Sequence, residues 1–142
     1  MNCREVMTAN PVCCLPTDTV SMAARVMRRE DVGPVPVVND EQSKQLIGIV
    51  TDRDLAVRVV AEARDPNHTC VSDVMTTTIF ACRPDDDLTS AINAMEEHQI
   101  RRIPVVDEDG RIVGIISEGD VAMRVYAPEM SGEMVAKVSQ VA

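Results

Sequence analysis

Two short motifs in this chain place a hydroxyl three residues before a carboxylate. They run from Thr51 to Asp54 and from Ser117 to Asp120, and each follows a short apolar segment typical of a buried strand. This spacing is that of a helix capping box with Asp in place of Glu. The same groups can also bind a ligand, because a carboxylate near exposed helix N–H groups accepts hydrogen bonds from a vicinal diol. Both interpretations stand, and one pair of residues can serve both.

The two motifs lie in an internal repeat. Val6-Met7-Thr8 recurs 68 residues later as Val74-Met75-Thr76, and Pro36-Val37-Val38 recurs as Pro104-Val105-Val106. After a loop that is two residues shorter in the second copy, residues 46–56 match residues 112–122 at a shift of 66. A shared order of so many features indicates a duplicated unit.

Each copy predicts the element order β-α-β-β-α in an α/β fold. A first helix is expected after Pro16 or Pro84, capped by Asp18 or Asp86, and a second helix begins at Thr51 or Ser117. The predicted organisation is a first repeat over 1–60, a connector over 61–70, a second repeat over 71–127 and a tail over 128–142. The apolar spacing in the tail allows a short amphipathic helix, and fraying is equally compatible with it.

Composition excludes several functions. The net charge of 14 − 23 = −9, and a sequence without Trp and with one Phe and one Tyr, argue against nucleic-acid binding. The chain contains no apolar run of membrane-spanning length, and its amino terminus lacks a signal-peptide pattern, so we expect a cytoplasmic protein away from membranes. The five cysteines are then expected to be reduced and inert, with redox sensing as the alternative. The sequence has no metal-ligand spacing and no catalytic motif, and His98 is expected on the surface near a helix end.

The repeated Val-Met-Thr opening and the Gly-apolar-apolar-Thr/Ser-x-x-Asp ending resemble a tandem pair of cystathionine β-synthase (CBS) domains, known as a Bateman module. The stretch from Met95 to Val105 further resembles small stand-alone bacterial CBS-pair proteins of the hypoxic-response type. The resemblance implies pseudo-two-fold symmetry and two clefts that bind AMP, ADP, ATP or S-adenosylmethionine as regulatory ligands. It also implies a non-enzymatic module that needs no catalytic cofactor.

By this resemblance, Asp54 and Asp120 take the ribose, while Thr51 and Ser117 take the sugar or the first phosphate. The adenine of each cleft would contact aliphatic groups of the opposite repeat's opening segment. The expected contacts are Thr8, Pro11, Val12, Cys13 and Ile115 in the Asp120 cleft, and Ile49, Thr76, Ile79, Phe80 and Ala81 in the Asp54 cleft. The simpler interpretation, that Val12 and Ile79 belong to the core, stays open. Gly48 and Gly114 are expected to let a ligand approach the strand ends.

The arginines differ between the copies. Arg101 and Arg102 align with Gly33 and Pro34, and Arg53 aligns with Gly119. We therefore expect the Asp54 cleft, with Arg53 and Arg102, to favour a phosphorylated ligand, unless these arginines are merely solvated.

Two functions follow from the resemblance. The first is a homodimeric sensor, paired through its helices, whose contacts with a further protein change when an adenine nucleotide binds. The second is a nucleotide-free scaffold that acts by protein–protein contact in a stress response.

Overall fold

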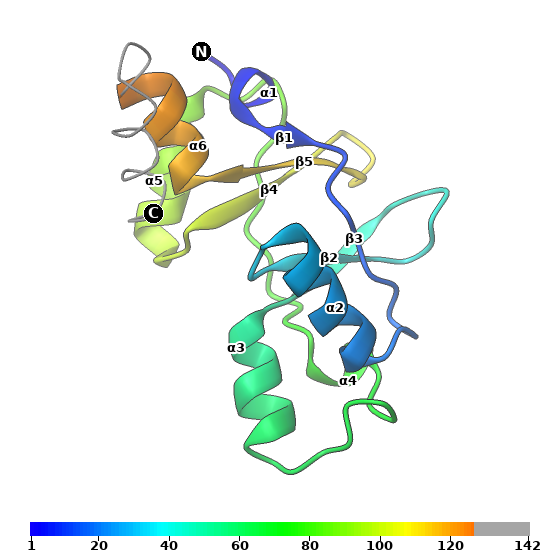
Figure 1. Cartoon of the computed structure of the whole chain (residues 1–142). Helices are drawn as coiled ribbons and strands as arrows, with labels where there is room; N and C mark the ends of the chain where they lie inside the picture. The colour runs from blue at the N-terminus through cyan, green and yellow to red at the C-terminus, as the bar shows by residue number, and fades with distance from the viewer. Residues whose placement is uncertain (127–142) are drawn as a thin grey trace. The chain divides into compact units, whose positions relative to one another are not determined.

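The computed structural model describes residues 1–126, so the tail predicted over 128–142 lies outside the described residues (Figure 1). The predicted β-α-β-β-α order is present in the first repeat, whereas the second repeat has isolated bridges at Thr76 and Cys82 in place of the opening strand. In both repeats an additional short helix ends at the valine of the Val-Met-Thr segment. The elements of the first repeat are α1 (Cys3–Val6), β1 (Thr8–Ala9), α2 (Val20–Glu30), β2 (Val35–Val38), β3 (Leu46–Val50), α3 (Asp52–Leu55) and η1 (Ala56–Val60). Those of the second are α4 (Val71–Val74), α5 (Leu88–His98), β4 (Arg102–Val106), β5 (Ile112–Ser117), α6 (Glu118–Val121) and η2 (Ala122–Tyr126).

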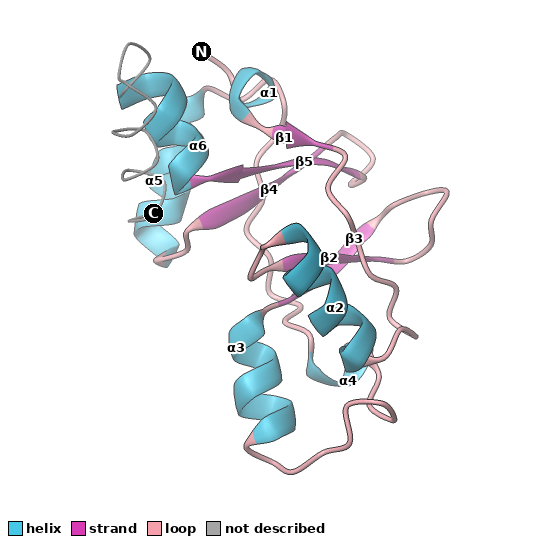
Figure 2. Ribbon diagram, viewed as in Figure 1, coloured by secondary structure: helices cyan, strands magenta, loops and turns pink. Residues whose placement is uncertain are grey.

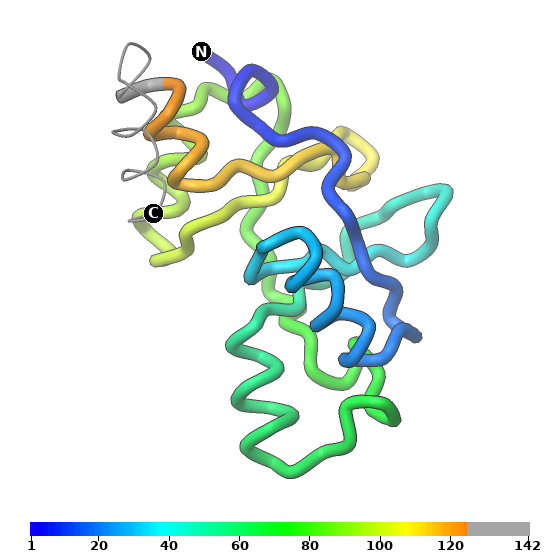
Figure 3. The backbone as a smooth tube through the Cα atoms, viewed as in Figure 1, coloured from blue at the N-terminus to red at the C-terminus, as the bar shows by residue number. Residues whose placement is uncertain are grey.

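The chain forms two compact units, and each combines parts of both repeats. The Asp120 unit contains residues 1–10 and 80–108 and the described residues from 113 onward. The Asp54 unit contains residues 11–79 and 109–112. The opening segment of each repeat therefore folds with most of the rest of the other repeat, as the amino-terminal trace in Figure 3 illustrates for residues 1–10.

In the Asp54 unit, β2 and β3 form an antiparallel ladder that pairs Val35 with Val50 and Val37 with Gly48. Cys14 adds a parallel bridge to Val37, and α2 packs on β2 and α3. The buried core consists of Cys14, Val20, Ala23, Met27, Val35, Val37, Val50, Val59, Val71 and Val74. Two of these, Val71 and Val74, come from the opening segment of the second repeat.

In the Asp120 unit, the strand order is β1-β5-β4 (Figure 2), with Thr8 opposite Ile115 and Ala9 opposite Gly114. Cys82 bridges Val105 in parallel, as Cys14 bridges Val37 in the other unit. The buried core consists of Cys3, Val6, Cys82, Leu88, Ala91, Met95, Ile103, Val105, Ile116 and Val121. Here Cys3 and Val6 come from the opening segment of the first repeat.

The predicted caps of the long helices are wrong by one residue. Thr19 caps α2 by accepting a hydrogen bond from the Met22 N–H (3.3 Å), and Asp87 caps α5 by accepting one from the Thr89 N–H (3.0 Å). Asp18 instead accepts a hydrogen bond from the Leu15 N–H (2.9 Å) and closes the preceding turn. Asp86 makes the same turn with the N–H of residue 83 (2.9 Å). An Asx-type turn competes with capping for the same carboxylate, and the neighbouring residue takes the helix end.

No helix within residues 1–126 combines the length and the apolar character needed to cross a membrane.

Candidate functional site

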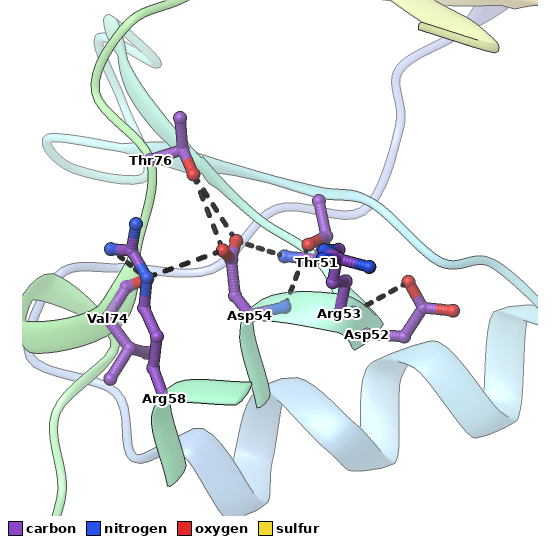
Figure 4. A network of polar contacts seen from close by, with 7 residues as sticks. All are labelled: Thr51, Asp52, Arg53, Asp54, Arg58, Val74 and Thr76. Carbon is purple, nitrogen blue, oxygen red and sulfur yellow. Dashed lines mark hydrogen bonds and ion pairs between the residues drawn. The ribbon is translucent and has the colours of Figure 1, made fainter. Parts of the chain in front are cut away.

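Both hydroxyl–carboxylate motifs form complete capping boxes. The Thr51 hydroxyl accepts a hydrogen bond from the Asp54 N–H (3.1 Å), and the Asp54 carboxylate accepts one from the Thr51 N–H (2.9 Å; Figure 4). Ser117 and Asp120 repeat this pattern with two distances of 3.0 Å. The capping interpretation is confirmed. It fixes each carboxylate at the point where a strand, β3 or β5, turns into a helix.

Asp54 also faces the opening segment of the second repeat. The Thr76 hydroxyl lies 3.5 Å from each Asp54 carboxylate oxygen, and Arg58 Nε lies 3.9 Å from Oδ1 (Figure 4). Only 11% of the Asp54 side chain is exposed. The Thr76 backbone pairs with Ile49 through two hydrogen bonds of 2.8 and 2.9 Å. The structure thus brings together Ile49, Thr51, Asp54 and Thr76, four of the predicted site residues.

Sequence reasoning missed Arg58 and Arg124, which occupy equivalent positions four residues after each site aspartate. Arg58 donates a hydrogen bond to the Val74 carbonyl (3.3 Å), and Arg124 donates one to the Glu5 carbonyl (2.6 Å). Each arginine therefore holds the short helix, α4 or α1, that precedes a Val-Met-Thr segment. The recurrence of Asp-x-x-x-Arg in both copies was the available signal.

The expectation that Gly48 and Gly114 admit a ligand is wrong. A Cβ at Gly48 would lie 2.6 Å from the Met75 sulfur, and one at Gly114 would lie 2.8 Å from Met7 Cγ. The methionine of each Val-Met-Thr segment therefore occupies the space above a glycine. These glycines lack a side chain because a methionine packs against the strand there.

The Asp120 unit brings together Thr8, Ile115, Ser117 and Asp120. Thr8 is exposed in β1 opposite Ile115, and Asp120 is half-buried. Pro11, Val12 and Cys13 belong to the Asp54 unit. Burial raises the pKa of the Cys13 thiol, and its sulfur contacts the Pro11 carbonyl oxygen at 3.3 Å.

Phe80 and Ala81 are both exposed, and they belong to the Asp120 unit, whereas Ile79 is half-buried in the Asp54 unit. The Phe80 ring stacks on the His98 imidazole, with centroids 3.4 Å apart and planes at 9°. One ring face of Phe80 is thus covered by a residue of its own unit. His98 is half-buried at the last position of α5, and the predicted proximity to a helix end is confirmed.

The three candidate phosphate-binding arginines occupy different elements. Arg53 is exposed on α3, directly before Asp54. Arg102 is half-buried at the start of β4. The carbonyl of the exposed Arg101 accepts a hydrogen bond from the Glu118 N–H (3.0 Å), as Gly33 does from Asp52 (3.2 Å). These matching bonds support the alignment of residues 101 and 33. Arg53 belongs to the Asp54 unit and the other two arginines to the Asp120 unit.

Comparison with known proteins identifies the family. The sequence model of the CBS domain family matches residues 3–61 and 71–127. CBS domain-containing protein YhcV of Bacillus subtilis is 37% identical over 136 residues, which are 96% of this chain and 94% of YhcV. Hypoxic response protein 1 of Mycobacterium tuberculosis is 35% identical over 119 residues, which are 84% of this chain and 81% of that protein. Both relatives are therefore largely made up of the matched region.

Solved structures give the same result. A crystal structure of Hypoxic Response Protein I with two coordinated zinc ions has a TM-score of 0.79 and 33% identity, covering 88% of this chain and 99% of that one. Among residues 1–126, no three His, Cys, Asp or Glu side chains gather as metal ligands do. CBSX2 in complex with AMP has a TM-score of 0.76 and 26% identity, covering 90% and 98%. This chain belongs to the CBS domain family and carries two copies of the domain in tandem.

Proposed function

We propose that this protein is a non-enzymatic regulatory module that binds an adenosine-containing ligand of the AMP, ADP or ATP type. The observation that carries the proposal is the spare acceptor capacity of Asp54. Its carboxylate accepts one short hydrogen bond, from the Thr51 N–H, while its contacts with Thr76 and Arg58 are 3.5 and 3.9 Å long. A carboxylate has about four acceptor positions, so this one can take a ribose diol without breaking the cap.

The relatives support this choice of ligand. CBSX2, at 26% identity, was solved with AMP, and it matches over 90% of this chain. S-adenosylmethionine is the other ligand that the family resemblance implies. The absence of a candidate nucleophile or general base from the sequence motifs supports a role in binding instead of catalysis.

Within this proposal, the two sites are not equivalent. Arg53 directly precedes Asp54, whereas Gly119 precedes Asp120. A cation next to the carboxylate favours a ligand with phosphate groups. We expect Arg53→Gln to weaken ATP binding more than adenosine binding, as measured by calorimetry.

The proposed response is a change in protein–protein contact, in a homodimer or with a further partner. Equivalent positions of the last helices carry exposed apolar side chains, Val57 (49% exposed) on η1 and Met123 (46%) on η2. Val60 on η1 is 76% exposed. Exposed apolar residues that recur in both repeats favour a helix-mediated dimer.

A nucleotide-free scaffold is the second candidate, and one observation favours it. Met7 and Met75 fill the space beside Gly114 and Gly48, where a ligand was expected to approach. A scaffold of this kind would use the same exposed helices for protein contact in a stress response, and its carboxylates would serve only as caps.

Thermal unfolding separates the two candidates. Millimolar AMP, ADP, ATP or S-adenosylmethionine is expected to raise the melting temperature of a sensor and to leave a scaffold unchanged. Asp54→Glu and Asp120→Glu are the informative variants, because Glu at this position still completes a capping box but displaces the carboxylate. We expect each variant to keep the melting temperature without ligand within a few degrees of the unmodified protein. The ligand-induced rise should be lost at the altered site, because losing one charged hydrogen bond lowers the ligand affinity roughly tenfold. Unchanged affinity in both variants would contradict the proposed ribose contact.

A further inference from the structure

Two buried thiols that are 82 − 3 = 79 positions apart in the sequence meet in the Asp120 unit. Cys3 on α1 and Cys82, just before the turn that leads to α5, are 0% and 5% exposed in the same core cluster. Each thiol is close enough to the other to influence its pKa. Cys3 Sγ also lies 4.0 Å from the Asp87 carbonyl, and Cys82 Sγ lies 3.8 Å from the Pro104 carbonyl.

The backbone holds the two cysteines in this position. The N–H groups of Cys3 and Arg4 donate hydrogen bonds of 3.0 Å to the carbonyls of Asp86 and Pro84. Residues 3–4 thus run along the turn that follows Cys82. Arg124, on η2, also donates a hydrogen bond to the Glu5 carbonyl. A side-chain cross-link at this point would therefore join segments that are already docked.

We propose that Cys3 and Cys82 form a reversible disulfide that fastens the opening segment, residues 1–10, to the Asp120 unit. The co-reactant is a small-molecule disulfide such as oxidised glutathione. One cysteine sulfur attacks it, releases one glutathione thiol and forms a mixed disulfide. The second cysteine sulfur then displaces the other glutathione thiol. Two cysteine S–H bonds are replaced by one S–S bond, and the glutathione disulfide is reduced to two thiols.

The environment of the pair makes this cross-link conditional on local opening. Burial raises the pKa of both thiols, and the nearby Asp86 carboxylate raises each further. A protonated, buried thiol is a poor nucleophile, so the docked pair resists exchange. Reaction requires residues 1–10 to undock and expose Cys3, after which the segment redocks and the bond closes.

The other unit provides an internal comparison. Val71 and Cys14 stand at the repeat-equivalent positions in the core of the Asp54 unit. The Val71 N–H donates to the Asp18 carbonyl (2.8 Å), as the Cys3 N–H does to Asp86. The same geometry with valine cannot form a disulfide, so the cross-link distinguishes two otherwise equivalent units.

The fold itself suggests the variants for the test. The background variant carries Cys13→Ala and Cys70→Asn, because Ala81 and Asn2 are the residues at the equivalent positions of the other repeat. It leaves Cys3, Cys14 and Cys82 as the only thiols. Trypsin does not cleave the Arg83–Pro84 bond, so the tryptic peptide over residues 65–101 then contains Cys82 as its single cysteine, and the partner of Cys82 can be assigned without ambiguity. In this background, Cys3→Val removes the proposed bond, and Val71→Cys offers Cys14 an equivalent partner. For the Val71→Cys variant, an additional chymotryptic cleavage after Phe80 separates position 71 from Cys82.

Oxidation with glutathione disulfide, followed by alkylation and non-reducing peptide mapping, is the measurement. We expect a Cys3–Cys82 peptide pair, faster formation in dilute urea, and a rise in melting temperature of roughly 5–15 °C that dithiothreitol reverses. Cys3→Val should abolish the pair and the rise, and Val71→Cys should add a second pair through Cys14. Recovery of Cys3 and Cys82 as alkylated thiols, even after oxidation in dilute urea, would overturn the proposal. Cross-linking that unfolds residues 1–10 would overturn it as well.

Discussion

Asp54 and Asp120 each meet two requirements with one side chain. Their carboxylates complete a capping box, which satisfies a backbone N–H at the start of a helix. The box also holds the carboxylate in one rotamer at the end of a strand, so a ligand that binds there pays little ordering entropy. A residue in this position is therefore suited to ligand binding because it is first a structural residue.

Gly114 illustrates the opposite case, a position governed by packing. A Cβ there would lie 2.8 Å from Met7 Cγ and 3.0 Å from Met7 Cβ, so the clash involves the stem of the methionine. At Gly48 the stem of the methionine is farther away, with Met75 Cγ at 3.2 Å, so the main clash is with the Met75 sulfur, which has more freedom to move.

We predict that Gly114→Ala lowers the free energy of unfolding by about 1–3 kcal/mol, more than Gly48→Ala does, because overpacking a close contact forces β1 away from β5. Urea denaturation measures both. Met7→Ala in the Gly114→Ala background should restore part of the loss, since it removes the atoms that clash. A double variant that is as unstable as the sum of the single variants would contradict this explanation.

Among the elements, α5 begins at a titratable cap. The Asp87 carboxylate accepts a hydrogen bond from the Thr89 N–H, which lowers the pKa of Asp87 below its ordinary value of 3.8. The pKa values of Asp40 and Asp65 are also lowered, by hydrogen bonds from Ser43 and His68 respectively. A lowered pKa means that the ionised form is stabilised in the folded state.

We therefore predict that stability is constant from neutral pH down to about 4 and falls below it, as these carboxylates are protonated. Asp87→Asn should keep the cap, because Asn also accepts from helix N–H groups, but remove one titrating group. The melting temperature measured from pH 7 to pH 2 should consequently fall less steeply in this variant. An identical slope for both proteins would show that Asp87 does not contribute.

At the scale of the whole molecule, the repeats exchange their opening segments. Residues 1–10 complete the core of the Asp120 unit, and residues 71–79 complete that of the Asp54 unit. Neither repeat has a complete core without the other. The core of the Asp54 unit would lack Val71 and Val74, and that of the Asp120 unit would lack Cys3 and Val6. The tandem copy is thus a condition for stability.

The exposed apolar positions on η1 and η2 lead to a prediction about assembly. If the last helices form a dimer interface, Val57→Glu and Met123→Glu should convert the dimer to a monomer, because each buries an unpaired charge. Size-exclusion chromatography with light scattering measures the mass. Gln42→Glu, in an exposed loop, makes the same change of charge and should leave the mass unchanged. Dimers that persist in both helix variants would place the interface elsewhere.

The sequence alone was sufficient for the duplication, for the two capping boxes and for the element order, except for the opening strand of the second repeat. These features depend on short-range patterns: apolar spacing within an element and residues three apart at a helix start. The family resemblance then identified the tandem CBS pair and pointed to Asp54 and Asp120. The caps of α2 and α5 were misplaced by one residue because adjacent polar residues compete locally for the same role.

The family resemblance had placed Thr76 near Asp54; otherwise only the tertiary structure decided which segment packs with which. The placement of Met7 over Gly114, the approach of Thr76 to Asp54 and the meeting of Cys3 with Cys82 join residues that are far apart in the chain. Periodicity and spacing describe neighbours along the chain and carry no information about such pairs. They form because each half-built core gains most by burying the apolar face of the other repeat's opening segment.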